Sequence, residues 1–331
     1  MLILNKTDLF KVLSMGETID AMRTAFASFS SGKAVVPERI RLDIDTYHGS
    51  TLFMPAYNNS RENVPELTCL KTVSVYPENT GKGLPTINSV ILLLDSTNGK
   101  PIALIDGGFI TAMRTGAAAG LATELLARTD SQVLAVFGAG LQAETQLEAV
   151  SEVRDIRQVW IYDPDRKRSE RLVKKVEMMK LKIPQVSVAN SPHEAVKHAD
   201  IICTVTTSRR PVFNSDSVKP GVHINAIGSF TPDTWEIPAN IILNSMLVVD
   251  SRKAALREAG DILHLINEGK MADGHIHAEL GEIILDVKKG RLDDRQITVF
   301  KSVGIAVQDL FAAKRAWVKA REANLGQTII M

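Results

Sequence analysis

Two positively charged side chains stand in apolar surroundings, where a charge needs a partner. Lys71 interrupts the strand-like run Leu70-Lys71-Thr72-Val73, and Arg114 lies near the start of an otherwise apolar helical stretch. An anionic substrate would satisfy both, because arginine offers a planar pair of donors and lysine a point charge. An internal salt bridge to Asp106 or Glu124 explains each of them equally well. Both interpretations stay open at this point.

A glycine-rich turn in mid-chain indicates a second kind of site. The apolar run 133–137 leads into Gly138-Ala139-Gly140-Leu141-Gln142-Ala143, which fits the pattern G-x-G-x-x-G/A. Gly138 allows a tight turn, Gly140 lets backbone approach a pyrophosphate, and the small Ala143 lets the next helix pack closely on the strand. The first N–H groups of that helix would point at the phosphates. The turn therefore predicts a dinucleotide site; the alternative is an ordinary turn of a doubly wound sheet.

The end of the next apolar run bears on the choice of dinucleotide. The run 157–163 ends in Asp163, whose carboxylate can accept hydrogen bonds from both ribose hydroxyls of NAD. Arg166, Lys167 and Arg168 follow at once and could pair with the 2′-phosphate of NADP, although a solvated helix face explains them as well. NAD(H) is the favoured cofactor, and NADP(H) is the alternative.

The elements before the glycine turn indicate a separate domain. Apolar positions at helical spacing predict a helix over 17–32. Strand-like runs punctuated by Pro, Gly and Asn predict an antiparallel sheet, with strands at 51–57, 67–75, 86–94 and 101–106 and a hairpin turn at 97–100. An alanine-rich helix over 110–128 then leads into the strand before the glycine turn.

After the turn, helices and strands alternate, as a parallel sheet requires. The predicted helices are 165–180 and 192–198, and the predicted strands are 185–189, 200–206, 221–227 and 246–250. The C-terminal stretch returns to helix and is expected to pack back on the N-terminal domain. The fold class is therefore α/β, with a Rossmann doubly wound parallel sheet domain and an α+β substrate-binding domain.

The domain limits follow from this pattern. We expect a substrate-binding domain at 1–115 with 304–331 and an NAD(P)-binding domain at 116–303. A substrate cleft is expected between the N-terminal sheet and the carboxyl ends of the Rossmann strands.

Composition narrows the function class. The chain has 331 residues, of which 45% are hydrophobic and 23% charged, and a formal net charge of +1, which indicates neither nucleic-acid nor membrane binding. Its start is too polar for a signal peptide, and no window approaches about eighteen uninterrupted apolar residues. We expect a cytoplasmic protein that acts on a small molecule. Cys69 and Cys203 match no metal spacing and are expected to be buried free thiols.

Two histidines invite a metal interpretation. His275 and His277 lie near Glu279 and Glu282, but this spacing gives no complete ligand set. A loop followed by a helix over 278–287 accounts for the polar residues, and no metal is expected.

Six motifs follow one another along the chain. They are Lys71, 82–86 (KGLPT), 113–116 (MRTG), 138–143 (GAGLQA), 223–228 (HINAIG) and 298–304 (TVFKSVG). In this order they resemble the ornithine cyclodeaminase/mu-crystallin family from about residue 1 to the C-terminus. The resemblance implies a homodimer in which the N-terminal sheet domains associate.

The resemblance also implies residue roles. Arg39, Lys71 and Arg114 would hold the substrate carboxylate. This favours an anionic substrate over an internal salt bridge as the partner of Lys71 and Arg114. The residues implied to approach the dinucleotide are Thr86, Arg114, Gly138, Ala139, Gly140, Leu141, Gln142, Asp163, Arg166, Thr204, Ala226, Ile227, Gly228, Lys301 and Ser302. Ser302 and Phe230 are also implied to border the substrate.

One departure from the family pattern separates its branches. Cyclodeaminases place an aspartate, which serves as acid and base, two residues after the glycine of the Asn-Ala-Ile/Val-Gly stretch. Phe230 occupies this position here, and phenylalanine cannot move a proton. The form Gly-Ser-Phe-x-Pro looks like the branch that reduces cyclic ketimines, for which an apolar wall is suitable.

The resemblance thus implies NAD(P)H-dependent reduction of Δ1-pyrroline-2-carboxylate to L-proline, and in some members of Δ1-piperideine-2-carboxylate to L-pipecolate. Lys71 is further expected to help set the protonation state near the imine, which makes it the candidate catalytic residue. The alternatives are an alanine or other amino-acid dehydrogenase, an ornithine cyclodeaminase and a mu-crystallin-like ligand-binding protein.

Overall fold

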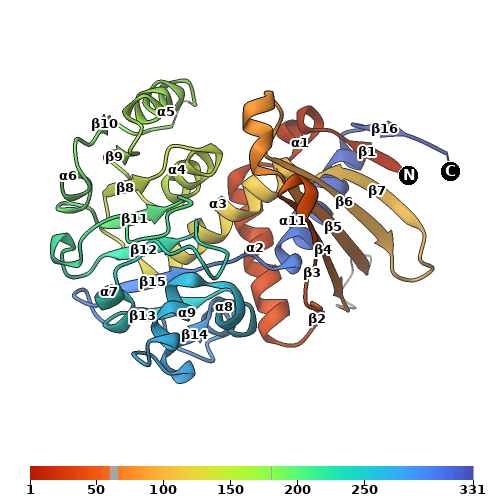
Figure 1. The fold of residues 1–331 in the computed structure, drawn as a ribbon. Helices are drawn as coiled ribbons and strands as arrows, with labels where there is room; N and C mark the ends of the chain where they lie inside the picture. Colours follow the sequence, from red (N-terminus) through yellow and green to blue (C-terminus); the bar gives the residue numbers. More distant parts are fainter. Residues whose placement is uncertain (60–65, 180, 331) are drawn as a thin grey trace. The chain divides into compact units, whose positions relative to one another are not determined.

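The computed structural model describes residues 1–59, 66–179 and 181–330, and the chain divides into two units (Figure 1). The mixed-sheet unit comprises Met1–Arg114 and Ile305–Met331, and the parallel-sheet unit comprises Thr115–Gly304. Among the described residues, no helix combines the length and hydrophobicity that a membrane crossing needs.

The mixed-sheet unit is built on one sheet whose strands run in the order β16-β1-β7-β6-β5-β4-β2, with β3 also paired to β4. The strands are β1 (Leu2–Leu4), β2 (Ala34–Val35), β3 (Ile40–Ile44), β4 (Gly49–Asn58), β5 (Leu67–Val75), β6 (Ile87–Asp95), β7 (Pro101–Asp106) and β16 (Gln327–Thr328). The pairs from β3 to β7 are antiparallel, as predicted, but β1 pairs with β7 in parallel. The sheet is therefore mixed rather than antiparallel throughout.

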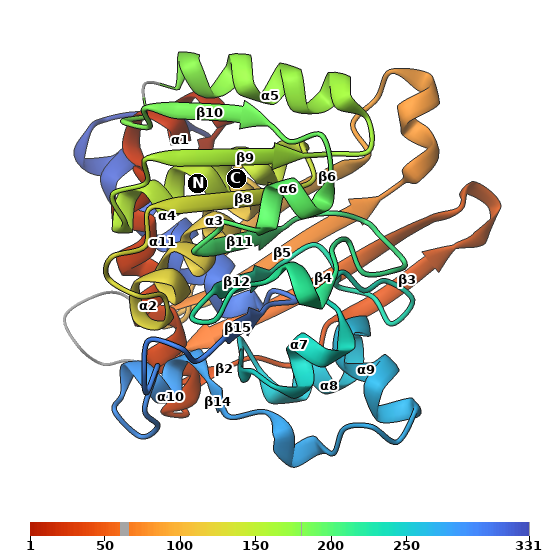
Figure 2. The same ribbon diagram turned by 90° about the vertical axis from the view of Figure 1, so that its left-hand side faces the viewer.

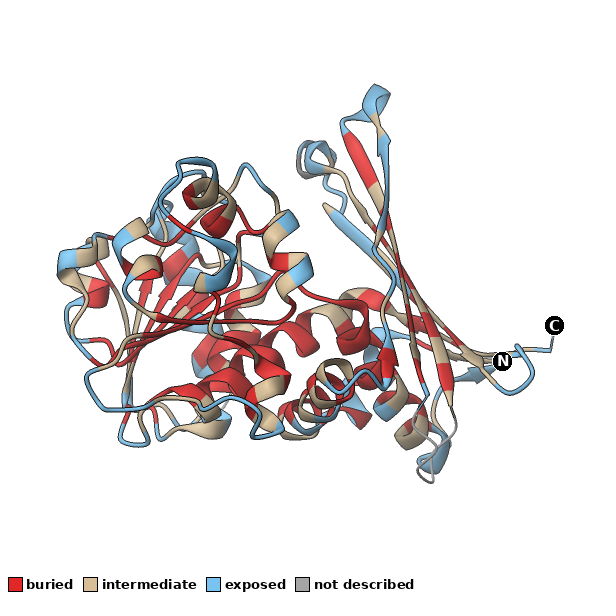
Figure 3. Cartoon of the chain, turned by 90° about the horizontal axis from the view of Figure 1, so that it is seen from below, coloured by how far each residue is buried: buried red, intermediate tan, exposed pale blue. Residues whose placement is uncertain are grey.

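Helices cover one face of this sheet, which explains the alternating burial along its strands (Figure 3). The helices of the unit are α1 (Lys6–Val12), α2 (Met15–Ser30) and α11 (Ala306–Glu322), and α3 (Gly107–Leu126) begins here. Helix α11 packs on α2, β4, β5 and β6, where its buried alanines permit close approach. The predicted return of the C-terminal helix to the N-terminal unit is confirmed. Residues buried on β5 therefore face α11.

The parallel-sheet unit has the strand order β10-β9-β8-β11-β12-β15-β13-β14, and every pair is parallel (Figure 2). The strands are β8 (Val133–Phe137), β9 (Gln158–Tyr162), β10 (Gln185–Val188), β11 (Ile201–Thr204), β12 (His223–Ala226), β13 (Met246–Val249), β14 (Ala278–Glu279) and β15 (Thr298–Lys301). The helices are α4 (Leu141–Val153), α5 (Arg166–Met178), α6 (Pro192–Val196), α7 (Ala239–Leu243), α8 (Arg252–Glu258), α9 (Gly260–Asn267) and α10 (Leu280–Ile284). This is the predicted doubly wound fold.

The strand order reverses between β8 and β11, which lie side by side although β9 and β10 separate them in sequence. In open α/β sheets, ligands bind outside the carboxyl ends of the strands at such a reversal. The fold thus places a binding crevice after Phe137 and Thr204.

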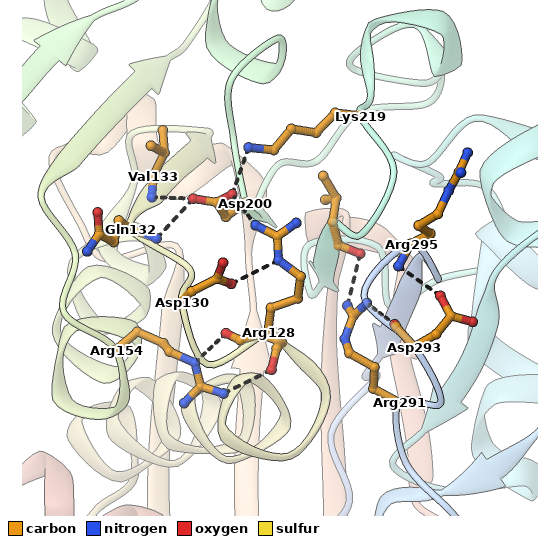
Figure 4. Close-up of polar contacts among 12 residues, drawn as sticks. Arg128, Asp130, Gln132, Val133, Arg154, Asp200, Lys219, Arg291, Asp293 and Arg295 are labelled. Carbon is orange, nitrogen blue, oxygen red and sulfur yellow. Dashed lines mark hydrogen bonds and ion pairs between the residues drawn. The ribbon is translucent and has the colours of Figure 1, made fainter.

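Charged side chains bind backbone groups at the opposite, amino-terminal end of the same sheet (Figure 4). The Asp200 carboxylate accepts hydrogen bonds from the backbone N–H groups of Gln132 and Val133, both at 2.9 Å, and pairs with Lys219 at 2.7 Å. Arg154 donates to carbonyls at the end of α3, among them those of Thr123 and Ala127 at 3.0 Å. Satisfying helix-end carbonyls in this way stabilises the fold and leaves the ligand crevice to the other end.

The prediction of one helix over 278–287 is wrong, and the strand β15 was not predicted. The stretch 278–287 forms β14 and then the short helix α10, which ends at Ile284, so it is not one helix. Strand β15 carries the TVFK part of a quoted motif and inserts between β12 and β13. The last residue of the predicted helix 165–180 lies outside the described residues, and α5 ends at Met178.

Candidate functional site

The glycine turn forms one wall of the ligand crevice. Gly138 has a φ of +92°, and a Cβ there would lie 2.8 Å from the carbonyl oxygen of Val205, so only glycine fits. Gly140 caps α4 without any side-chain hydrogen bond, and nothing lies within 4 Å of where its Cβ would stand. Ala143 is fully buried against the sheet. The turn thus has the space and the N–H donors that a pyrophosphate needs.

The crevice is a pocket of about 970 Å³, which is within the size range of cofactor sites. Segments that follow β8, β9 and β11 line it, with residues 138–140, 162–165 and 205–208. Asp163 lies among them, and its carboxylate accepts hydrogen bonds from the N–H groups of Ala139 at 3.0 Å and Asp165 at 2.9 Å. This carboxylate is therefore held beside the glycine turn, where a ribose would lie.

The basic residues after Asp163 separate into two kinds. Arg166 pairs with Glu170 and Asn190, both at 2.9 Å, and is not among the residues that line the pocket. Arg168 does line it, and its Nε lies 3.6 Å from Asp165. Of the two arginines, Arg168 is the better placed for a 2′-phosphate, so the expectation for Arg166 is not supported.

The loops after β11 and β12 lie against each other beside the pocket. The N–H groups of Ile227 and Gly228 both donate to the Thr204 carbonyl at 3.0 Å, and a Cβ on Gly228 would come 2.2 Å from the Thr206 carbonyl oxygen. The Thr204 hydroxyl donates to Glu236 at 3.0 Å. One tightly packed layer beside the pocket thus contains Thr204, Ala226, Ile227 and Gly228. Ala226 is fully buried in this layer.

The two candidates at the carboxyl end of β15 have buried side chains with protein partners. The Lys301 ammonium lies 2.9 Å from Asp261 and donates to the Ser229 carbonyl at 2.5 Å. The Ser302 hydroxyl donates to Asp250 at 2.7 Å. The Lys301 ammonium therefore binds neighbouring protein groups, and the expected contact of this residue with the dinucleotide stays a prediction. Leu141 and Gln142 open α4 next to Gly140, and Phe230 is 40% exposed.

The two cations set in apolar sequence meet in the mixed-sheet unit. Lys71 on β5 is 1% exposed, and its Nζ lies 2.6 Å from Oδ2 of Asp309 on α11. The Arg114 Nε donates to Oδ1 of the same carboxylate at 3.1 Å, and its Nη1 donates to Gln308 at 3.1 Å. The partner is therefore Asp309, and neither Asp106 nor Glu124 takes this place. Two cations on one carboxylate leave a net positive charge, which suits a further anion.

Charge and burial also tune Lys71. Burial lowers the pKa of Lys71 to about 8, with the positive charges of Arg114 and Arg39 adding to the effect and Asp309 opposing it. Arg39 lies between β2 and β3 and is half-buried, whereas Thr86 lies just before β6, with its carbonyl accepting the Tyr76 N–H at 2.8 Å. The structure thus brings Lys71 and Arg114 together, with Arg39 close enough to act on their charge.

The remaining predictions concern a metal site and the two cysteines, of which Cys69 lies on β5 close enough to Lys71 and Asp309 to interact with their charges. Among the described residues, no group of His, Cys, Asp and Glu could hold a metal ion. The His275 and His277 rings bond the carbonyls of Ile242 and Lys289. Cys69 and Cys203 are buried and free, as predicted.

A family model, described as the ornithine cyclodeaminase/mu-crystallin family, matches residues 1–324. The chain belongs to this family. A Δ1-pyrroline-2-carboxylate reductase of Bacillus cereus is 39% identical over 330 residues, which is 99% of each chain.

Solved structures of family members are similar over the whole chain. The Thermococcus litoralis Δ1-pyrroline-2-carboxylate reductase in complex with NADH and L-proline has a TM-score of 0.94 and 44% identity, covering 99% of this chain and 100% of that one. An archaeal alanine dehydrogenase dimer with bound NAD has a TM-score of 0.92 and 34% identity, covering 100% and 99%.

The residues of this family member that the sequence did not reveal are buried acids. Asp309, Glu236, Asp250 and Asp261 each bind a residue or loop expected at a site, and each is buried. For Asp309 a signal was present, since an acid interrupts the apolar positions of the C-terminal helix. Asp250 ends an apolar run, as Asp163 does, whereas the local sequence offers no signal for Glu236 and Asp261.

Proposed function

We propose that this protein is an NADH-dependent ketimine reductase that converts Δ1-pyrroline-2-carboxylate to L-proline. The observation that carries the proposal is its full-length similarity, at 44% identity, to a reductase solved with NADH and L-proline. Phe230 in place of an acid/base residue agrees with a substrate whose C=N bond is already formed. Six-membered Δ1-piperideine-2-carboxylate is a further substrate of the same class.

The net positive cluster of Lys71, Arg114 and Asp309 binds the substrate carboxylate, with Arg39 as a third cation. Arginine supplies two donors in a plane, and the buried setting strengthens each contact. One carboxylate on the substrate therefore fixes both its place and its orientation.

The glycine cradle, the pocket and Asp163 fit a dinucleotide, and NAD(H) is the cofactor. When bound, NADH supplies a hydride to the carbon of the C=N bond. The C=N π electrons then become a lone pair on nitrogen, which takes one proton. Lys71, with its pKa near 8, is the proposed donor of that proton.

The proposal extends to assembly and location. Large apolar side chains are exposed on the mixed sheet, among them Ile40, Leu42, Ile87 and Val90, which supports a homodimer formed through this unit. The archaeal alanine dehydrogenase relative was solved as a dimer. Free cysteines at both described positions support a cytoplasmic location, where thiols stay reduced.

A second candidate is an amino-acid dehydrogenase, because the archaeal alanine dehydrogenase is also similar over the full length. An NADH-oxidation assay separates the two, with Δ1-pyrroline-2-carboxylate, Δ1-piperideine-2-carboxylate, and pyruvate with ammonium as substrates. Conversion of ornithine to proline and ammonia consumes no NADH overall, so activity on ornithine with NAD is measured as ammonia release. We expect turnover of the cyclic imines without ammonium. Activity on pyruvate and ammonium alone would favour the dehydrogenase, and activity on ornithine without turnover of either imine would overturn the main proposal.

A further inference from the structure

Glu236 is a fully buried carboxylate that joins two loops of the parallel-sheet unit. It lies in the irregular segment between β12 and α7. Its Oε1 accepts the Thr206 N–H at 2.6 Å. Its Oε2 accepts the Thr204 hydroxyl at 3.0 Å and the N–H groups of Gly228 at 2.8 Å and Ser229 at 3.1 Å. Four donors from the carboxyl ends of β11 and β12 thus converge on one side chain.

The position of Glu236 is itself fixed by neighbouring charges. Asp261 Oδ1 accepts the N–H groups of Glu236 at 2.6 Å and Ile237 at 2.9 Å, and its Oδ2 lies 2.9 Å from the Lys301 ammonium. Lys301 also binds the Ser229 carbonyl. The Ser229 backbone is therefore held on both sides, by Glu236 through its N–H and by Lys301 through its C=O.

Both loops that Glu236 holds carry positions important for ligands. Residues 205–208 line the dinucleotide pocket, and the segment 228–230 ends in the partly exposed Phe230. We propose that Glu236 is a positioning residue that fixes the pocket wall 205–208 and the segment 228–230 in one geometry. Bound NADH and the Phe230 side chain then keep a fixed distance and orientation to each other. The part concerning Phe230 rests on the proposed function.

A purely structural role would make Glu236 equivalent to Asp200, which provides a matched control. Asp200 lies at the amino end of the same strand β11, where it also accepts two backbone N–H groups and pairs with a lysine (Figure 4). Glu236→Gln and Asp200→Asn are the same chemical change, and the two carboxylates bind groups at opposite ends of β11. A glutamine amide nitrogen cannot accept any of the converging N–H groups, so it should push the two loops apart.

The test measures the NADH dissociation constant by fluorescence titration, the kcat and KM for Δ1-pyrroline-2-carboxylate, and the Tm of both variants. We expect Glu236→Gln to weaken NADH binding and lower kcat, each by about tenfold, as for loss of a preorganised site. Asp200→Asn should lower Tm at least as much but keep both constants within about twofold. If Glu236→Gln does not fold, Glu236→Asp, which keeps the charge and shortens the reach, takes its place with the same readouts.

Equal effects of the two variants on binding and turnover, or unchanged constants in the Glu236 variant, would overturn the proposal. The NADH titration needs no imine. If the wild-type protein binds NADH but reduces no cyclic imine, the proposed function fails while the titration still decides the role of Glu236 in the pocket wall.

Discussion

The Asp309 carboxylate lies 2.6 Å from the Lys71 ammonium, and both side chains are buried between β5 and α11. Arg114 shares the same carboxylate. The charge state of Lys71 therefore depends on Asp309, which lies near the C-terminal end of the chain. A substitution of either residue can test the pair.

Lys71→Met tests the proton role. The ammonium donates only while protonated, so the wild-type reduction rate at saturating substrate should fall as the pH rises through about 8. The variant should lose this pH dependence and should reduce the imine at least about tenfold more slowly in single turnovers. If substrate affinity falls but the single-turnover rate does not, Lys71 only binds the carboxylate.

Asp309→Asn tests the ion pair from the other side. Asp309 opposes the lowering of the Lys71 pKa, so its neutralisation should shift the fall in rate to a pH below 8. Breaking a buried ion pair should also cost about 3 to 5 kcal/mol in the free energy of unfolding. Asp106→Asn is the control, because that carboxylate caps the Phe109 N–H instead. A pH profile identical to that of the wild type would contradict the coupling.

Asp163→Ala tests the cofactor assignment. Loss of the ribose acceptor should raise the KM for NADH by roughly tenfold and the KM for NADPH much less, as expected for a charge-assisted hydrogen bond. Arg166→Ala should change neither, since Arg166 binds Glu170 and Asn190 outside the pocket lining. An equal rise for both cofactors would show that Asp163 does not select between them.

His223→Asn tests a prediction about stability. Burial lowers the pKa of His223 to about 3, and the ring lies between Thr298 and Asn225. The unfolded chain binds this proton below about 6.5, whereas the folded protein does not until about 3, so stability should fall as the pH drops between these values. Tm measured from about pH 7 to about pH 4.5 should decline less steeply in the variant than in the wild type. Parallel curves would exclude His223 as a source of acid sensitivity.

The sequence predicted what depends on local pattern. The strand 67–75 alternates between covered and open faces, and its limits coincide with those of β5. Gly138 and Asp163 could be located because a turn of fixed geometry imposes fixed spacing. Lys71 and Arg114 could be named because charges in apolar runs are rare.

What the sequence could not predict depends on contacts between distant residues. No spacing rule joins Lys71 to Asp309, because the sheet and α11 meet only through the tertiary fold. Glu236 lies in a segment without regularly spaced apolar residues, so the sequence pattern gives no indication of its four hydrogen bonds. Lys301 was predicted from its motif to contact the dinucleotide, but no sequence pattern indicated that its ammonium binds Asp261 and the Ser229 carbonyl.

The path of the chain through the mixed-sheet unit has a consequence for biosynthesis. Strands β1 to β7 are synthesised first, but α11, which packs on β4, β5 and β6, follows the whole parallel-sheet unit. Because domains fold as units during translation, the face of β5 that carries Lys71 stays uncovered until α11 has left the ribosome. A chain that stopped after Gly304 would contain the entire dinucleotide pocket and yet lack the carboxylate that Lys71 and Arg114 share.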